Sequence, residues 1–120
     1  KDSLTGGAAA DVFDFNAVTE SRTTSATRDV ILDFVHGQDD IDLSTIDAIG
    51  GGANNAFGLL ARSGASSAVG SGKIGYFWED KAGSANDKTI LRINNDGDAG
   101  IEMTIELKGL HTMHTSDFVL

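Results

Sequence analysis

Two glycines followed by an aspartate are the first residues in this sequence whose types and spacing favour cation binding. Residues 4–15 read LTGGAAADVFDF, with Gly6 and Gly7 ahead of Asp11. Glycine allows the backbone to turn tightly with its carbonyl groups directed inward, and Asp11 returns a carboxylate to the same turn. Oxygen atoms of these kinds are the ligands that hard cations such as Ca²⁺ prefer. The stretch therefore predicts part of a hard-cation site.

The residues after this turn alternate between apolar and polar types, as a half-buried strand does. Residues 12–15 place Phe13 and Phe15 on one face, where they can cover a core. Residues 16–27 are rich in serine and threonine and lack apolar periodicity, which predicts a surface loop.

A second concentration of aspartates lies in residues 28–46, RDVILDFVHGQDDIDLSTI. We expect a strand over residues 30–35 and a turn over residues 36–40, after which Ile41 and Leu43 resume the alternation. The apolar side chains of this strand fall on two faces, with Val30, Leu32 and Phe34 on one and Ile31 and Val35 on the other.

The composition favours a single domain with one modest core. The chain has 120 residues, of which 40% are apolar, and this is too little for two domains. Its 15 glycines, clustered at turns, indicate many short strands rather than long helices. Cysteine is absent, so the fold depends on no disulfide. No stretch approaches the roughly 20 apolar residues that a membrane span requires.

The charge of the chain excludes some partners and favours others. A formal net charge of −9 repels phosphate backbones and anionic lipids, so neither nucleic acid nor a membrane is expected as a partner. An acidic chain attracts cations, although a merely soluble acidic surface explains the same composition. The positions of the acidic residues must decide between these two interpretations.

Both aspartate-bearing segments resemble patterns of one bacterial family. The first resembles the nine-residue GGxGxDxUx repeat of RTX proteins, and Ala9 stands where a third glycine is usual. Residues 28–44 resemble the RDVIxDFxxGxDxIDLS signature of serralysin-type C-terminal domains. The resemblance implies an all-β fold in which a truncated parallel β-roll, with calcium between stacked turns, is followed by a mostly antiparallel β cap.

Ligand number argues that two turns share each ion. Calcium takes about 6 to 8 oxygen ligands, and one turn supplies only part of that set. The expected metal ligands are Gly6, Gly7, Ala9, Asp11, Asp29 and Asp39. Further candidates in the second segment are Asp33, Asp40 and Asp42. A solvated strand position or a hydrogen-bonding cap is the alternative explanation for Asp33 and Asp42.

The C-terminal half is expected to form the cap. Residues 45–52 predict a short helical turn ended by three glycines, and a further strand is expected near Phe57. Residues 73–80, 89–93 and 101–107 predict strands with antiparallel pairing. The last of these is expected to bury one face and to direct Glu102, Thr104, Glu106 and Lys108 to water.

The strand at residues 74–78 is rich in aromatic side chains. Ile74, Tyr76 and Trp78 are expected on one face and Phe77 on the other, which favours core packing. Stacking of a sugar ring on these side chains is the alternative, and it makes a polysaccharide a possible partner.

The acidic turn at residues 94–102, NNDGDAGIE, also offers oxygen donors. Asn94, Asp96 and Asp98 alternate as in the first half of an EF-hand, but Ala99 and Ile105 occupy the places where an EF-hand needs Gly and Glu. A hairpin turn without metal explains these residues, and Asp96 and Asp98 remain additional metal candidates.

The last four residues resemble the closing pattern of the family. They are Asp117, Phe118, Val119 and Leu120. In that family the C-terminal region is read by a type I secretion apparatus, which implies a secreted, extracellular bacterial protein. A final strand that pairs with the roll is a compatible reading of the same residues.

Catalytic motifs are absent from the chain. It contains neither HExxH nor GxSxG, and His111 and His114 lack a third metal ligand at a recognised spacing. The sequence therefore predicts a non-catalytic module, residues 1–120, with a calcium-binding roll over 1–46 and a cap with a secretion signal over 47–120. Since the chain begins in mid-motif, we expect it to follow an upstream catalytic domain. The alternative function is a carbohydrate- or surface-binding module.

Overall fold

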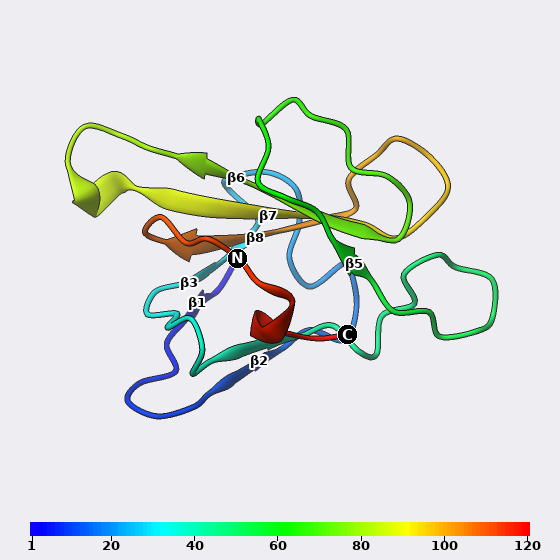
Figure 1. Cartoon of the computed structure of the whole chain (residues 1–120), viewed down its shortest axis with the longest axis horizontal. Coiled ribbons are helices and arrows are strands. Elements are labelled where there is room, and N and C mark those ends of the chain that lie inside the picture. Colours follow the sequence, from blue (N-terminus) through cyan, green and yellow to red (C-terminus); the bar gives the residue numbers. More distant parts are fainter.

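The computed structural model describes all 120 residues and is built from nine short strands in two sheets (Figure 1). The strands are β1 (Ser3–Leu4), β2 (Val12–Asp14), β3 (Asp29–Ile31), β4 (Asp40–Asp42), β5 (Gly58–Leu59), β6 (Lys73–Glu79), β7 (Lys88–Asn94), β8 (Met103–Lys108) and β9 (Phe118–Val119). Two single-turn 3-10 helices are η1 (Ser84–Asn86) and η2 (Thr115–Asp117). The expected all-β class is confirmed. No helix here has the length and apolar character that crossing a bilayer demands.

The first four strands form two stacked coils of a parallel roll. β1 pairs in parallel with β3 in one sheet, and β2 pairs in parallel with β4 in the other. The chain passes from the first sheet to the second through residues 5–11 in one coil and through residues 32–39 in the next. The two passages therefore stack on each other, as the resemblance implied.

The cap extends both sheets of the roll. The larger sheet has the order β1-β3-β8-β7-β6-β5, in which β6, β7 and β8 pair antiparallel, while β3 pairs in parallel with β8. The smaller sheet has the order β2-β4-β9, and β9 lies parallel to β4. The predicted antiparallel cap and the predicted closing strand are both confirmed.

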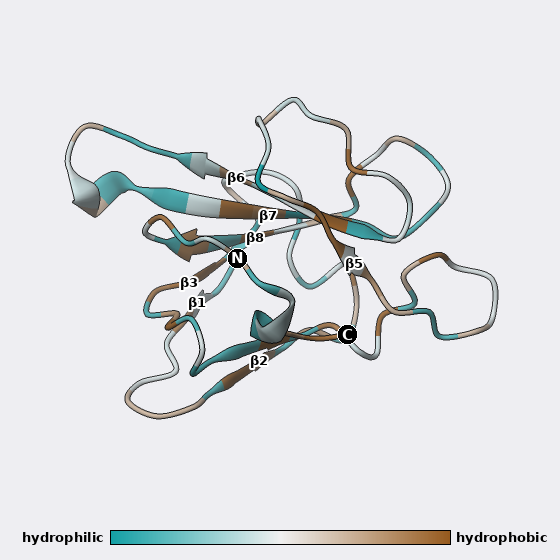
Figure 2. Cartoon of the chain, viewed as in Figure 1, coloured by the Kyte–Doolittle hydropathy of each residue, from teal (hydrophilic) through white to brown (hydrophobic).

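One apolar core fills the space between the two sheets. It joins side chains of the smaller sheet, such as Phe13 and Ile41, to side chains of the larger sheet, such as Ile31 and Leu91. Burial of each large apolar side chain contributes roughly 1.5–3 kcal/mol. Figure 2 shows apolar stretches within the strands, whereas the surrounding loops are mostly pale or hydrophilic and carry a few short apolar segments.

The predicted strand at residues 30–35 is shorter in the structure. β3 ends at Ile31, and Leu32 and Val35 are exposed, whereas Phe34 is buried. The chain leaves the strand because carboxylates within residues 32–39 bind backbone N–H groups, including that of Val35. Side chains of a turn do not follow the two-residue period on which the prediction depended.

The outward-facing side chains of β8 were predicted to be exposed to water, and this prediction was wrong for two of them. Thr104 and Glu106 are each only 5% exposed. The polar loop after β2 covers them: Ser21 Oγ donates to the Thr104 carbonyl at 2.5 Å, and Thr104 Oγ1 donates to the Arg22 carbonyl at 2.9 Å. Residues 45–52 form turns and bends instead of the expected helical turn.

Candidate metal centre

The first turn places the carboxylate of Asp11 directly over the backbone of Gly6. A Cβ atom at residue 6 would lie 2.7 Å from Asp11 Oδ2, so only glycine leaves room for this approach. Gly7 has a φ of 108°, a conformation that side chains with a Cβ rarely adopt. No non-glycine residue has positive φ, so Ala9 occupies its place in the turn without backbone strain.

The second turn holds the first through two carboxylates. Asp33 Oδ1 and Oδ2 accept hydrogen bonds from the N–H groups of Gly6 at 3.0 Å and Gly7 at 2.9 Å. Asp39 Oδ1 accepts from the N–H of Asp11 at 3.1 Å, and its Oδ2 accepts from the N–H of Val35 at 2.8 Å. These carboxylates therefore tie the two turns together through backbone donors.

One oxygen of Asp11 has no such donor. Oδ2 of Asp11 is buried and has no hydrogen-bond partner. A carboxylate oxygen removed from water without a donor or cation is costly, which is why such atoms in native proteins are nearly always paired. A hard cation beside this oxygen would remove that cost, so the donor set of the first turn fits calcium.

The other predicted aspartates of the roll lie along its strands. Asp29 begins β3, is buried, and accepts from the N–H of Asp2 at 2.7 Å. Asp40 and Asp42 belong to β4, and Asp42 Oδ1 accepts from the N–H of Ser44 at 2.8 Å. The structure brings Asp39 to the backbone of Asp11 but gathers no three carboxylates around it.

A second acidic group lies in the turn between β7 and β8. Ligand atoms of Asp96, Asp98 and Glu102 all fall within 4.8 Å of one another. Each carboxylate also accepts a hydrogen bond from one backbone N–H group. Asp96 accepts from the N–H of Asp98, Asp98 from that of Gly100, and Glu102 from that of Asn95. The turn that forms the β7–β8 hairpin therefore also brings these carboxylate oxygens together, and this turn is a candidate metal site.

Glu102 was not among the predicted metal ligands, because the alternation of residues 101–107 predicts a strand that directs this side chain to water. β8 begins only at Met103, so Glu102 still belongs to the turn and folds back toward Asp96 and Asp98. Its position four residues after Asp98, within a glycine-containing acidic turn, was the available signal.

The C-terminal segment is anchored by a buried carboxylate. Asp117 is 0% exposed, lies 2.5 Å from His36 Nδ1 through Oδ1, and accepts the N–H of His114 at 2.7 Å through Oδ2. The rings of His36 and His114 pack 4.5 Å apart, whereas the His111 ring packs against Phe34. His111 and His114 thus lie in different surroundings and do not share a site.

The aromatic strand mainly supplies packing. Tyr76 is buried in the core, as predicted. Trp78 donates from Nε1 to the His111 carbonyl at 2.7 Å, and the guanidinium of Arg62 lies 4.0 Å from the centre of its ring. One face of Trp78 is therefore already occupied, which leaves less ring surface for stacking a sugar.

Stacked glycine–aspartate turns on a parallel roll, closed by an antiparallel sheet, define this molecule as a β-roll module. The chain belongs to the peptidase M10 serralysin C-terminal family, whose pattern it matches over residues 1–120. No curated protein matches the chain.

Two solution structures are similar to the whole chain. They are the R3 and R2 subunits of AlgE6, a mannuronan C5-epimerase of Azotobacter vinelandii, with TM-scores of 0.59 and 0.57 and sequence identities of 23% and 24%. Each match covers 99% of this chain, but only 57% of the R3 structure and 65% of the R2 structure. The likeness shows a shared fold.

Proposed function

We propose that this chain is a calcium-binding, non-catalytic C-terminal module that couples folding of a secreted bacterial protein to its arrival outside the cell. Membership of the serralysin C-terminal family supports the class of protein. The single observation that carries the calcium claim is the buried, unpartnered Oδ2 of Asp11 above Gly6. Residues 1–46 would form the calcium-binding roll and residues 47–120 the cap.

The first turn would hold calcium with the carboxylate of Asp11 and with backbone carbonyls of Gly6, Gly7 and Ala9. Asp33 and Asp39, whose oxygens accept backbone N–H groups, would mainly hold the turns in position. Asp96, Asp98 and Glu102 would form a second site, supported by the approach of their oxygen atoms. Asp29, Asp40 and Asp42 remain possible contributors at the roll.

Calcium would act on this chain by stabilising its folded state. The stacked turns exist only in the folded chain, so an ion that binds them shifts the folding equilibrium by mass action. Bacterial cytosol holds far less free calcium than the medium, so the module would fold after export. A type I secretion apparatus would recognise the C-terminal segment that ends in residues 117–120.

The catalytic activity of the whole protein would reside upstream of this module. The two similar structures are subunits of a mannuronan C5-epimerase, which supports the role of an accessory module attached to an enzyme. A polysaccharide-degrading or polysaccharide-modifying enzyme is one such parent, and a protease is another that the family name supports.

Export of a fused passenger tests the secretion role. We expect deletion of residues 117–120 to abolish release of the passenger into the medium of a strain with a type I apparatus. The substitution Ser116→Ala, at an exposed neighbouring position, is the control and should leave release unchanged. Undiminished release after the deletion would show that the secretion signal does not lie in residues 117–120, and it would not contradict the calcium role.

A further inference from the structure

The turn between β7 and β8 contains the only Asp–Gly step of the chain, at Asp96 and Gly97. Every other aspartate is followed by a residue with a side chain, and no asparagine precedes a glycine. Glycine has no Cβ to hinder its own amide nitrogen from approaching the side chain of the preceding residue. An Asp–Gly step is therefore the place where a main-chain nitrogen most easily attacks an aspartate carboxyl group.

The amide nitrogen of Gly97 is free to react. Its N–H group donates no hydrogen bond, although the N–H groups of Asp96 and Asp98 on either side both do. Gly97 is exposed, and a Cβ atom at this residue would have no heavy atom within 4 Å apart from its chain neighbours. The tip of the turn thus leaves this nitrogen unhindered and in contact with water.

The carboxyl group of Asp96 is folded toward the same nitrogen. Its Oδ1 accepts a hydrogen bond from the N–H of Asp98 at 2.9 Å, so the side chain bends forward along the main chain across the Gly97 peptide. This N–H donor also polarises the carboxyl group, and it would stabilise the charge that develops on the oxygen when a nucleophile adds to Cγ.

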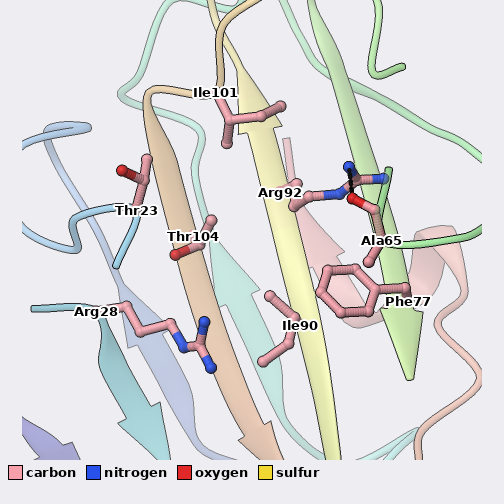
Figure 3. A pocket seen from close by; sticks show the side chains of 8 residues that line it. All are labelled: Thr23, Arg28, Ala65, Phe77, Ile90, Arg92, Ile101 and Thr104. Atoms are coloured by element: carbon pink, nitrogen blue, oxygen red, sulfur yellow. Dashed lines mark hydrogen bonds between the residues drawn. The ribbon is translucent and has the colours of Figure 1, made fainter. Parts of the chain in front are cut away.

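The base of the turn keeps these two groups in place. Asn94 is 0% exposed and donates from Nδ2 to the Val69 carbonyl at 2.8 Å and to the Asp98 carbonyl at 3.1 Å. On the opposite side of the turn, Ile101 lines the cavity on the outer face of the larger sheet (Figure 3). The Asp98 peptide is therefore attached to a buried residue, which holds the donor to Asp96 in position.

We propose that Asp96 and Gly97 form a site of spontaneous backbone isomerisation, in which the side-chain carboxyl group of Asp96 takes over the peptide link to Gly97. The Gly97 nitrogen bonds to Cγ of Asp96, and the nitrogen's proton leaves with the carboxyl hydroxyl group as water. This closes a five-membered succinimide ring. A second water adds to the former main-chain carbonyl carbon of Asp96, and the bond from that carbon to the nitrogen breaks.

The product is an isoaspartate of unchanged mass, because one water is lost and one is gained, and no group is oxidised or reduced. The main chain becomes longer by one methylene group, and the free carboxylate is attached directly to Cα of residue 96. The approach of Asp96, Asp98 and Glu102 within 4.8 Å belongs to the unmodified turn. Isomerisation therefore gives this acidic turn a limited lifetime, and the reaction itself does not depend on a bound cation.

Peptide mapping of the aged 120-residue chain tests the proposal. The chain is kept for several weeks at neutral pH, at the lowest calcium concentration at which circular dichroism shows it folded, beside an unfolded peptide of residues 91–103. We expect the fragment with Asp96 to separate into two species of equal mass, one of which resists cleavage at residue 96 by an aspartate-specific protease. Conversion of the peptide without conversion of the folded chain would overturn the proposal.

Two variants in this turn locate the reaction. Gly97→Ala should keep the fold, since its Cβ meets no neighbouring atom and residue 97 lacks positive φ, but the Cβ should slow isomerisation at least about fivefold. Asp98 accepts the N–H of Gly100 as Asp96 accepts that of Asp98, but Ala99 follows it. Asp98 should therefore stay unmodified, and Ala99→Gly should add isoaspartate at residue 98. An unchanged rate in Gly97→Ala would contradict attack by the Gly97 nitrogen.

Discussion

The carboxylate of Asp11 is the single group on which the calcium assignment depends most. One of its oxygens is buried without a hydrogen-bond donor, and the carboxylate lies so close to Gly6 that residue 6 has no space for a side chain. In the absence of a cation this arrangement is destabilising, and with a cation it becomes a ligand. The Asp11 carboxylate should therefore destabilise the fold without calcium and stabilise it when calcium is bound.

Asp11→Asn should remove most of the stabilisation that calcium gives. Because the amide lacks the negative charge, we expect the calcium-induced rise in melting temperature to shrink, and the melting temperature in chelator to stay equal or rise. Thermal unfolding by circular dichroism measures both. Asp14→Asn, at an exposed position of β2, is the control. An unchanged calcium-induced rise in the Asp11 variant would contradict the role of this residue.

Glu106 should contribute to acid sensitivity. Burial alone would raise its pKa, but hydrogen bonds from Lys88 and Arg28 and their positive charges outweigh burial, so the pKa of Glu106 lies below its ordinary value of 4.5. Because the folded pKa is the lower one, the stabilisation is complete above about pH 4.5 and disappears as the pH falls through the folded pKa.

Glu106→Gln should therefore destabilise the fold strongly at neutral pH and less in acid. Loss of the carboxylate charge leaves the buried guanidinium of Arg28 uncompensated, so we expect the free energy of unfolding at pH 7 to fall by about 3–5 kcal/mol. Urea unfolding at pH 7 and below about pH 4 measures the difference, which should narrow in acid. Glu79→Gln on β6, which forms no ion pair, is the control. An equal loss at both pH values would contradict the assignment.

At the scale of elements, η2 and β9 depend on one buried contact. Asp117 joins His36 of the second turn to the N–H of His114, and this holds β9 against β4, where the Leu43 N–H donates to the Val119 carbonyl at 2.9 Å. The end of the chain is therefore attached to the same turn that supports the first glycine–aspartate turn.

Asp117→Asn should loosen β9 without unfolding the roll. Loss of a charged hydrogen-bond acceptor costs roughly 1.5–3 kcal/mol, and the Leu43 amide should exchange with solvent faster. Hydrogen exchange by NMR measures this, with Ser116→Ala as the exposed control. Unaltered protection of Leu43 would show that the pairing of β9 with β4 does not depend on Asp117.

The sequence was most informative where local alternation and motif spacing determine structure. The β7–β8 hairpin and the closing strand follow from such patterns, and so do the stacked turns. Local patterns could not reveal that Ser21 covers Thr104, because 83 positions separate the two residues. For the same reason the contact between Arg28 and Glu106 was not foreseen, since 78 positions separate these two residues.

At the scale of the whole molecule, the stacked turns join the two sheets. Residues 5–11 link β1 of the larger sheet to β2 of the smaller one, and residues 32–39 link β3 to β4 in the same way. The larger sheet continues from β3 into the cap through β8. A cation held by these turns would consequently stabilise the roll and the cap together, and it would also reduce self-repulsion in a chain of net charge −9.

Isothermal titration calorimetry of calcium into the chelator-treated 120-residue chain tests the central claim most directly. We expect saturable binding, with a dissociation constant of about 10⁻³ M or lower as in extracellular calcium modules, and a melting temperature that rises with calcium concentration. Absence of binding heat and of any rise in melting temperature at about ten times that concentration would contradict the calcium-dependent module.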